Sequence, residues 1–471
     1  MKIVLINPRN DPAFPQPPLG LLHIASAVRE WASGWTVDLI DCNALDLDFE
    51  ACIRTIDHSA DVIGISAMTP NVLEASRIFD DIKARWPEMP TILGGPHITT
   101  IPEQTMNVCS SVDYGVLSEG EETVPELLDA IMGHHLTLDK VDGIVYRDHL
   151  TGELKLNKAR KHIKNLDRLP YPAYDLLPQP LTLYRPYPPH GRSLPYMTMV
   201  TTRGCPYNCS FCSKNVWGKV YNVFSADYVI KHVKHLQDEF GVQYIQFYDD
   251  SFTVHPKRIA EICKGIEPLK ITWSCETRVN LVNYEMLKQM KKGGCLLIGF
   301  GIESGVQRIL DLLTKGIKLQ ETRKAIERCD KIGIETSGYM MMGNPTETRE
   351  EIQQSVDFVK SIPLNYVQWS ICTPYLGTQL YKDAMKAGTV LPENWDEWVY
   401  VSLQALKEEK TPMILATDRF TSEELIEIQR KAYQQFYFSL PYIWRRLKKC
   451  TSWTGIKTNI RGLRLLRGML S

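Results

Sequence analysis

Three cysteines stand close together near the middle of the chain. Cys205, Cys209 and Cys212 are separated by three and then by two residues. Structural zinc usually requires a fourth protein ligand, and the next candidates, His232 and His235, stand about twenty residues further on in a segment with helical periodicity. Three thiolates leave one iron of a four-iron cluster open to a small molecule, as a catalytic cluster requires. The spacing therefore favours a catalytic iron-sulfur cluster over structural zinc.

The pattern around these cysteines resembles a known superfamily of enzymes. An aromatic residue, Phe211, stands directly before the last cysteine, and the segment follows a predicted strand. Together with the cysteine spacing, this resembles the radical S-adenosylmethionine (SAM) superfamily. The resemblance implies that the open iron binds the amino and carboxylate groups of SAM and that an electron from the cluster cleaves SAM to a 5′-deoxyadenosyl radical. It also implies an electron donor of the flavodoxin or ferredoxin type.

Polar segments follow the later predicted strands and are similar to positions that contact SAM in this superfamily. Asp249 or Glu303 alone could instead cap a helix or form an ion pair. The recurrence of such segments on successive strand ends favours a binding site. The candidate SAM-binding residues are Phe211, Asp249, Asp250, Arg278, Glu303, Ser304, Gly343 and Glu347.

Six repeats of strand and helix must position these segments. Because an α/β barrel carries its chemistry at the carboxyl ends of its strands, the repeats predict a partial or complete barrel over residues 196–375. Three methionines at 340–342 are predicted to fill its core, and Cys372 is predicted to be structural. The expected strands are 197–201, 244–248, 272–276, 296–300, 337–342 and 366–371.

Residues 1–141 show another alternation of strand and helix. Short apolar segments alternate with segments such as 71–86, in which apolar residues recur every three or four positions. This predicts a doubly wound parallel sheet, which binds its ligand at the carboxyl ends of its strands. The expected strands are 3–6, 36–40, 62–66, 91–93 and 114–117.

Loops at that edge contain glycines, which allow the backbone to approach a large flat ligand. Such a domain ahead of a radical SAM barrel resembles the cobalamin-binding subfamily, in which SAM also supplies a methyl group. The sequence contains no D-x-H-x-x-G motif, whose histidine binds cobalt in many cobalamin proteins, and His97 is expected to fix its own loop. The candidate cobalamin-binding residues are Pro18, Leu19, Ser66, Thr69, Gly94, Gly95, Pro96, His97, Glu119, Gly120 and Glu121.

The remaining two regions carry no such motif. A predicted hairpin over 143–156 opens a linker, residues 142–195, whose many prolines disfavour regular helix and central strand. Residues 376–471 are predicted to be helical. Residues 441–471 include eight Lys and Arg and no Asp or Glu. Two interpretations stay open for this tail: an amphipathic surface for anionic lipid, or helices packed on the barrel with solvated charges.

Composition limits the partners and the compartment. The formal net charge of the 471 residues is -1, so no global field attracts nucleic acid, and none is expected to bind. The N-terminus lacks the apolar stretch of a signal peptide, which predicts a cytoplasmic protein, peripheral to the inner membrane surface if the tail binds lipid. Most of the twelve cysteines are therefore expected to be reduced thiols.

The resemblance implies a cobalamin-dependent radical SAM methyltransferase that alkylates an unactivated carbon or phosphorus of a small or lipid-like molecule. The nearest alternative is a ring-forming enzyme similar to the anaerobic magnesium-protoporphyrin monomethyl ester cyclase. A tRNA methylthiotransferase is disfavoured because the N-terminal region lacks an obvious three-cysteine site for a second cluster. A non-enzymatic corrinoid or redox sensor is disfavoured because it would not require the polar segments at the strand ends.

Overall fold

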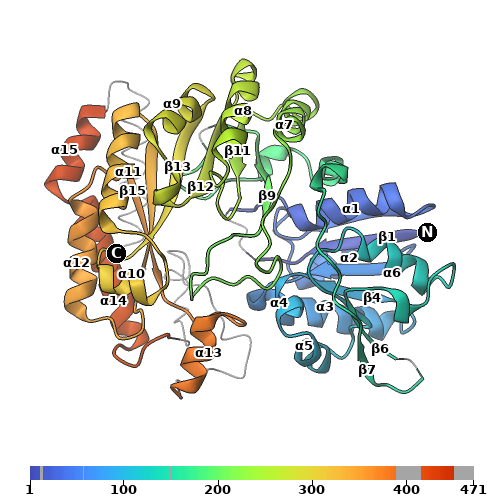
Figure 1. Cartoon of the computed structure of the whole chain (residues 1–471). Coiled ribbons are helices and arrows are strands. Elements are labelled where there is room, and N and C mark those ends of the chain that lie inside the picture. Colours follow the sequence, from blue (N-terminus) through green and yellow to red (C-terminus); the bar gives the residue numbers. More distant parts are fainter. Residues whose placement is uncertain (11–13, 57, 149, 192, 389–414, 450–471) are drawn as a thin grey trace. The chain divides into compact units, whose positions relative to one another are not determined.

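The structure is a computed structural model that describes residues 1–10, 14–56, 58–148, 150–191, 193–388 and 415–449 (Figure 1). The chain divides into two compact units. The first unit comprises residues 1–206, 214–250 and 271–273, and the second comprises residues 207–213, 251–270 and 274 onwards.

The first unit contains a seven-stranded sheet in the order β2-β1-β3-β4-β5-β6-β7. Strands β1 to β5 are parallel, which confirms the predicted doubly wound domain. Strand β6 pairs antiparallel with β5, and β7 pairs antiparallel with β6. The predicted hairpin, assigned to the linker from sequence, thus extends this sheet. The strands are β1 Lys2–Asn7, β2 Thr36–Asp41, β3 Val62–Ser66, β4 Thr91–Gly94, β5 Tyr114–Val116, β6 Ile144–Arg147 and β7 Leu154–Leu156.

Helices bury both faces of this sheet (Figure 1). Leu21 and Val28 of α1 share one hydrophobic core with Leu127 of α6 and with Ile3 and Leu5 of β1. Helix α3 buries the apolar residues at three- and four-residue spacing that predicted it. The helices are α1 Leu19–Trp31, α2 Phe49–Thr55, α3 Val72–Arg85, α4 Pro96–Thr100, α5 Pro102–Val108 and α6 Thr123–Ile131.

The proline-rich linker forms only short 3-10 turns in its described part after β7 and packs against the first sheet's loops. Tyr184 Oη donates to Asp41 Oδ2 at 2.7 Å, at the carboxyl end of β2. The backbone N–H of Arg185 donates to the Pro15 carbonyl at 3.1 Å. The linker therefore covers part of the edge where a ligand of this fold binds.

The second sheet has six strands in the order β15-β14-β13-β12-β11-β8. Sequence order is kept and β8 and β15 stand at the ends, which confirms the α/β barrel prediction in its partial form. The strands are β8 Tyr196–Met199, β11 Tyr244–Phe247, β12 Thr272–Thr277, β13 Cys295–Glu303, β14 Glu335–Met342 and β15 Tyr366–Ile371, and a separate antiparallel pair is β9 Thr202–Arg203 with β10 Asn222–Val223. The helices are α7 Ala226–Phe240, α8 Pro256–Ile266, α9 Tyr284–Lys292, α10 Gln307–Leu312, α11 Leu319–Ile332 and α12 Arg349–Lys360.

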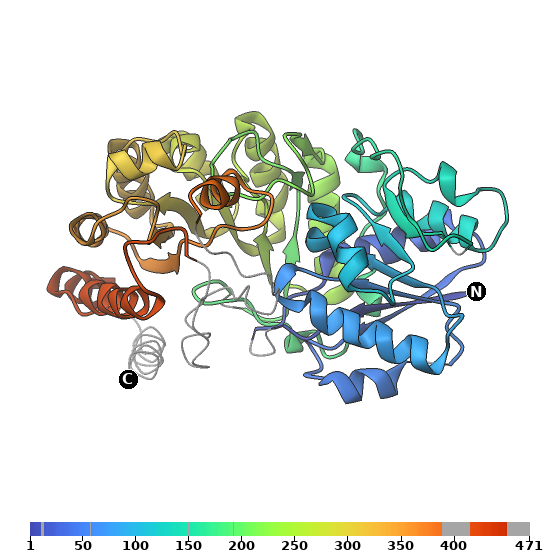
Figure 2. The same cartoon turned by 90° about the horizontal axis from the view of Figure 1, so that it is seen from below.

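Three C-terminal helices follow: α13 Gln379–Lys386, α14 Ser422–Tyr437 and α15 Leu440–Lys449. Helix α14 packs on β15 and α12, and α15 packs on α14 (Figures 1 and 2). The backbone N–H groups of Trp369 and Val367 donate to the hydroxyls of Tyr433 at 2.9 Å and Tyr437 at 3.1 Å. Side chains of α14 thus satisfy the edge of β15, which would otherwise present unpaired backbone groups. Within the described residues, none of the helices could cross a membrane.

Candidate functional site

The three cysteines of the motif differ from the others in exposure. Cys205 and Cys209 are partly exposed and Cys212 is exposed, whereas the other eight described cysteines are all buried. A cysteine ligand must be reachable by iron and sulfide, while a buried thiol behaves as a small apolar group. The structure therefore separates the motif's thiols from cysteines that fill cores, including Cys372.

The backbone of the cysteine loop is fixed by hydrogen bonds within the second unit. The N–H of Ser210 donates to the Leu313 carbonyl at 3.0 Å, and the N–H of Leu380 donates to the Ser210 carbonyl at 2.9 Å. Thr314 Oγ1 donates to the Asn208 carbonyl at 2.6 Å. These hydrogen bonds fix the backbone of the cysteine loop at Asn208 and Ser210.

Arg278 contacts the loop directly. Its Nη1 donates to Cys209 Sγ at 3.4 Å, and its guanidinium carbon lies 3.9 Å from the centre of the Tyr207 ring. Its Nη2 donates to the backbone carbonyl of Lys315. The side chain is buried. Sequence analysis predicts Arg278 as a SAM contact, and the structure shows that it also touches Cys209, a predicted cluster ligand.

Glu303 ends β13 in a left-handed conformation with φ of 65°, at an irregularity in the pairing with β14. Its Oε1 accepts a hydrogen bond from Lys315 Nζ at 2.7 Å, and both side chains are largely buried. Lys315 Nζ also lies 5.7 Å from the centre of the Phe211 ring. Lys315 thus brings together two predicted SAM-binding residues. No motif in the sequence marks this lysine.

Ser304 faces α12. Its hydroxyl accepts from the N–H of Val306 at 3.1 Å and lies 3.1 Å from Ser355 Oγ, which itself accepts from the N–H of Gly305 at 2.9 Å. These bonds shape the turn after β13. A contact between Ser304 and SAM stays a prediction.

The turn after β14 is closed by Glu347. Gly343 has a φ of 75°, and Glu347 Oε2 accepts from the N–H of Asn344 and from its side-chain amide, each at 3.0 Å. Burial raises the pKa of Glu347 to about 7. Burial also raises the pKa of Cys372, with further contributions from the charges of Glu347 and Glu303. Glu347 is therefore a buried carboxyl group in the turn after β14, and its contact with SAM stays a prediction.

Asp249 holds the strand that leads into the cysteine loop. Its carboxylate accepts from both backbone N–H groups and from both hydroxyls of Thr201 and Thr202, at 2.5 to 3.0 Å. These bonds make Asp249 a support of the loop, and a contact between Asp249 and SAM stays a prediction. Asp250, beside it, is exposed and keeps its predicted role.

The candidate cobalamin edge is formed by loops that contact one another. A Cβ at Gly95, whose φ is 101°, would meet the carbonyl oxygen of Ala67 at 2.6 Å and Ser66 Oγ at 2.9 Å. His97 Nδ1 lies 3.0 Å from Thr69 Oγ1, and burial lowers the pKa of His97 to about 4. The neutral His97 therefore ties the loops after β3 and β4 together, as expected for a loop-fixing residue.

The other candidate cobalamin residues surround these loops. Pro18 precedes α1, Leu19 begins it, Gly94 ends β4, and Pro96 begins α4. Gly120 packs close to α1, where a Cβ would meet Ile24 Cδ1 at 2.5 Å. The side chains of Glu119 and Glu121 are buried in ion pairs with Arg203, and Gly120 between them is buried as well.

The residues fit the two cofactors that the motifs imply. Three reachable thiols on one loop suit a 4Fe-4S cluster. Within the described residues, no three Cys, His, Asp or Glu side chains already converge on a metal position, so a cluster would draw the sulfurs together. Cobalamin suits the first sheet's edge: a Cβ at Gly20 would meet nothing within 4 Å, and one at Gly94 only backbone oxygens at 4.0 Å.

Comparison with known proteins agrees with the two cofactors that the motifs imply. Residues 199–359 match the Radical SAM superfamily, and residues 9–128 match the B12 binding domain. The chain is 35% identical over 447 residues to an uncharacterized methyltransferase of Pyrococcus horikoshii, covering 93% of this chain and 92% of that protein. It is 25% identical to the anaerobic magnesium-protoporphyrin IX monomethyl ester cyclase of Rubrivivax gelatinosus, covering 91% of this chain and 75% of that protein.

A solved structure shows the same fold. The radical S-adenosylmethionine methyltransferase TsrM of Kitasatospora setae, with cobalamin and a 4Fe-4S cluster bound, matches with a TM-score of 0.67. The match covers 83% of this chain and 76% of TsrM at 18% sequence identity.

Proposed function

The chain belongs to the cobalamin-binding radical SAM family, and on that premise we propose that it transfers a methyl group to an unactivated carbon or phosphorus of a small or lipid-like molecule. It is a radical SAM enzyme whose cofactors are a 4Fe-4S cluster, SAM and cobalamin. The observation that carries methyl transfer is the similarity, along nearly the whole chain, to a protein named as a methyltransferase.

The geometry of the second unit supports a SAM-cleaving centre. When bound, the cluster would supply the electron that cleaves SAM, and cobalamin would carry the methyl group. Cys205, Cys209 and Cys212 would hold the cluster. Arg278 donates to the sulfur of Cys209, so its buried positive charge would stabilise negative charge on that sulfur when the cluster is bound, and Lys315 forms a buried ion pair with Glu303.

The residues of the first unit support a cobalamin-binding role. Gly94 and Gly95 keep side chains away from the strand ends, and His97 is engaged with Thr69 inside the protein. Contacts of Pro18, Ser66 and the 119–121 loop with cobalamin are part of this proposal.

Ring formation is the second candidate, because the relative from Rubrivivax gelatinosus is named as a cyclase. Both reactions would use the same cofactors. SAM with a deuterated methyl group separates them: methyl transfer places three deuterium atoms in the product, whereas a product without label would exclude methyl transfer.

Two other functions find less support. A tRNA methylthiotransferase needs a second cluster, yet the described N-terminal cysteines, Cys42, Cys52 and Cys109, are buried. A corrinoid sensor would not cleave SAM. Formation of 5′-deoxyadenosine by the reduced, reconstituted protein would therefore exclude a sensor.

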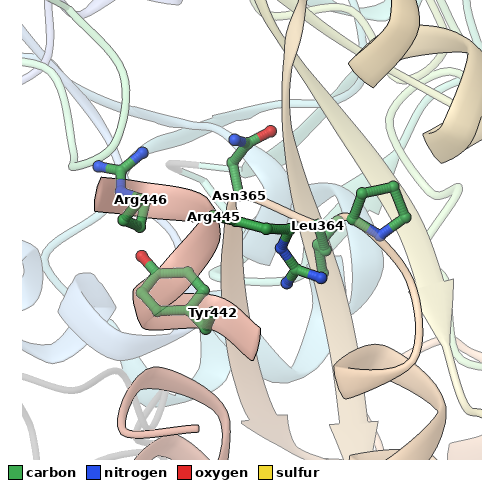
Figure 3. A pocket seen from close by; sticks show the side chains of 6 residues that line it. Leu364, Asn365, Tyr442, Arg445 and Arg446 are labelled. Carbon is green, nitrogen blue, oxygen red and sulfur yellow. The ribbon is translucent and has the colours of Figure 1, made fainter. Parts of the chain in front are cut away.

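Contact with an anionic membrane is a further part of the proposal. Leu440, Trp444 and Leu447, spaced for one face of α15, are 81%, 61% and 61% exposed. Arg446 turns instead toward the protein, where Nη2 donates to Tyr366 Oη at 3.4 Å. Figure 3 shows Tyr442, Arg445 and Arg446 of α15 around Leu364 and Asn365.

The exposed face of α15 is thus apolar, and positive charge for anionic headgroups comes from the tail sequence. The cavity in Figure 3 lies beside the amino end of β15, so it is separate from the strand ends that carry the motifs. Sedimentation with vesicles containing anionic lipid should fall for Trp444→Ser with Leu447→Ser. Equal sedimentation of variant and wild type would count against the contact.

The cofactor pair is tested by anaerobic purification with cobalamin supplied, followed by optical spectra and metal analysis. The proposal expects cobalt near one per chain and roughly four irons. An electron donor of the flavodoxin or ferredoxin type would then be assayed by the rate of 5′-deoxyadenosine formation. Metabolites that accumulate in a deletion strain would identify the substrate.

A further inference from the structure

Arg203 connects two parts of the first unit that the proposed function uses. It stands two residues before Cys205, and its guanidinium binds Glu119 and Glu121, the residues on either side of Gly120 in the loop after β5. We propose that Glu119, Arg203 and Glu121 form an ion-pair clamp that couples the cluster ligand Cys205 to the cobalamin-binding edge. This inference rests on the proposed cofactor pair.

The clamp is buried and has little freedom. Arg203 Nη1 donates to Glu119 Oε1 at 2.5 Å, and Nη2 donates to Glu121 Oε1. The side chains of Arg203, Glu119 and Glu121 are 5%, 3% and 7% exposed. One guanidinium with two carboxylates on separate nitrogens fixes both the position and the orientation of the arginine.

Its carboxylates are fixed from other elements as well. Glu119 Oε2 accepts from the N–H of Ile163 at 2.8 Å and lies 3.1 Å from His162 Nδ1. Burial alone would raise the pKa of Glu121, but the charge of Arg203 outweighs burial and holds it below its ordinary range. Hydrogen bonds from Ile163 and from Arg203 thus hold Glu119 in place, while Arg203 holds Glu121.

The turn between Arg203 and Cys205 is sterically confined at Gly204. Gly204 has a φ of 83°, and a Cβ there would lie 2.0 Å from the carbonyl oxygen of Val220. Only glycine fits this conformation and this contact. A shift of Arg203 would thus be passed to Cys205 rather than absorbed by the chain between them.

The segment that follows the cysteine loop is anchored on the same edge. Ser118 Oγ donates to the Val216 carbonyl at 2.5 Å, and Asn215 Nδ2 donates to Thr100 Oγ1 at 3.0 Å. The guanidinium of Arg203 lies 5.0 Å from the centre of the Trp217 ring. Both flanks of the cysteine loop therefore contact α4 or the loop after β5, which carry candidate cobalamin-binding residues.

The test measures whether the two cofactors influence each other's binding. Equilibrium dialysis with hydroxocobalamin, read by cobalt analysis, gives its Kd for protein with and without the reconstituted cluster. Wild type is expected to bind cobalamin at least about fivefold more tightly when the cluster is present, because coupling between sites typically reaches this size. Glu121→Gln and Arg203→Lys should bring the ratio of the two Kd values close to one.

Asp113→Asn is the matched control. Asp113 precedes β5 at its amino end and accepts from Lys83 Nζ at 2.7 Å, so Asp113→Asn removes an ion pair at the opposite end of the same strand. Its Kd ratio should equal that of wild type. Thermal unfolding of all four proteins shows whether loss of stability follows the loss of coupling.

If the clamp had a purely structural role, the substitutions would raise the Kd for hydroxocobalamin equally with and without the cluster. The ratio of the two Kd values would then equal that of wild type, which would overturn the proposal. A wild-type ratio near one would overturn it too. Wild type that bound no cobalamin would refute the proposed function, whereas normal cobalamin binding with unchanged ratios in the variants would refute the clamp alone.

Discussion

Arg278 donates a hydrogen bond from Nη1 to Cys209 Sγ over 3.4 Å while its guanidinium lies against Tyr207. A buried cation beside a ligand sulfur stabilises negative charge on that sulfur, and hydrogen bonds to sulfur and local charge set the reduction potential of iron-sulfur clusters. Arg278, which sequence analysis predicts to contact SAM, is therefore also expected to affect the reduction potential of the cluster.

Replacing Arg278 should alter the cluster without preventing its assembly. Arg278→Gln removes the positive charge, so the midpoint potential should become more negative, and 5′-deoxyadenosine formation should fall by about 10- to 100-fold. Redox titration followed by electron paramagnetic resonance measures the potential. Arg323→Gln is the control, because Arg323 binds Ser361 on the outside of the barrel. An unchanged potential in Arg278→Gln would refute this role.

Iron binding should depend on the exposed cysteines and on no buried one. Alanine at Cys205, Cys209 or Cys212 should reduce iron from roughly four per chain to near zero after reconstitution, since each supplies one ligand. Cys329→Ala tests a buried thiol on α11 and should retain its iron. Metal analysis with the optical spectrum decides the matter, and loss of iron in Cys329→Ala would show that exposure does not mark the ligands.

The elements could be predicted from sequence because each has a local signal. The eleven predicted strands, five in the first domain and six in the barrel, lie where short apolar segments alternate with helical periodicity, and all appear in the structure. The cysteine motif is likewise local. The place of the hairpin could not be predicted, because its first strand, β6, pairs with β5, and nothing within the hairpin specifies this partner.

Contacts between distant residues escaped prediction. Glu119 and Arg203 are 84 positions apart, and Asp249 lies 47 and 48 positions from the threonines it holds. Lys315 carries no motif, yet it stands between Glu303 and Phe211. A single sequence shows that these residues are charged, while the topology that joins them decides whether they face a ligand or each other.

Glu347 makes stability depend on pH. Burial raises its pKa to about 7, so between its ordinary pKa of 4.5 and about pH 7 the folded protein binds more protons than the unfolded chain. Its contribution to the free energy of unfolding should therefore fall across that range by about 3 kcal/mol. The amide of Glu347→Gln carries no charge, so the variant should show a smaller change in the free energy of unfolding with pH over this range. Thermal unfolding from pH 4.5 to 8 checks this, and a wild-type slope in the variant would contradict it.

Gly95 should be required for cobalamin binding. Alanine there adds a Cβ that meets Ala67 O at 2.6 Å, in addition to the strain of a φ of 101°. Gly133→Ala carries similar strain at a φ of 67° but meets nothing within 4 Å. Gly95→Ala should weaken hydroxocobalamin binding by about tenfold or more relative to Gly133→Ala, since a shift near 1 Å can cost this much. Equal affinities in equilibrium dialysis would show that the loop after β4 lies outside the site.

Asp249→Asn should damage the cysteine loop through its supporting strand. The carboxylate accepts four hydrogen bonds from Thr201 and Thr202, whereas an amide offers one acceptor oxygen and places N–H groups against the other donors. Unpaired buried donors cost about 1–3 kcal/mol each, so the variant should lose both stability and iron content. Asp250→Asn, at an exposed neighbour, should keep both. If Asp249→Asn kept its iron and stability but bound SAM more weakly, Asp249 would be a SAM contact after all, and isothermal titration with SAM distinguishes the two roles.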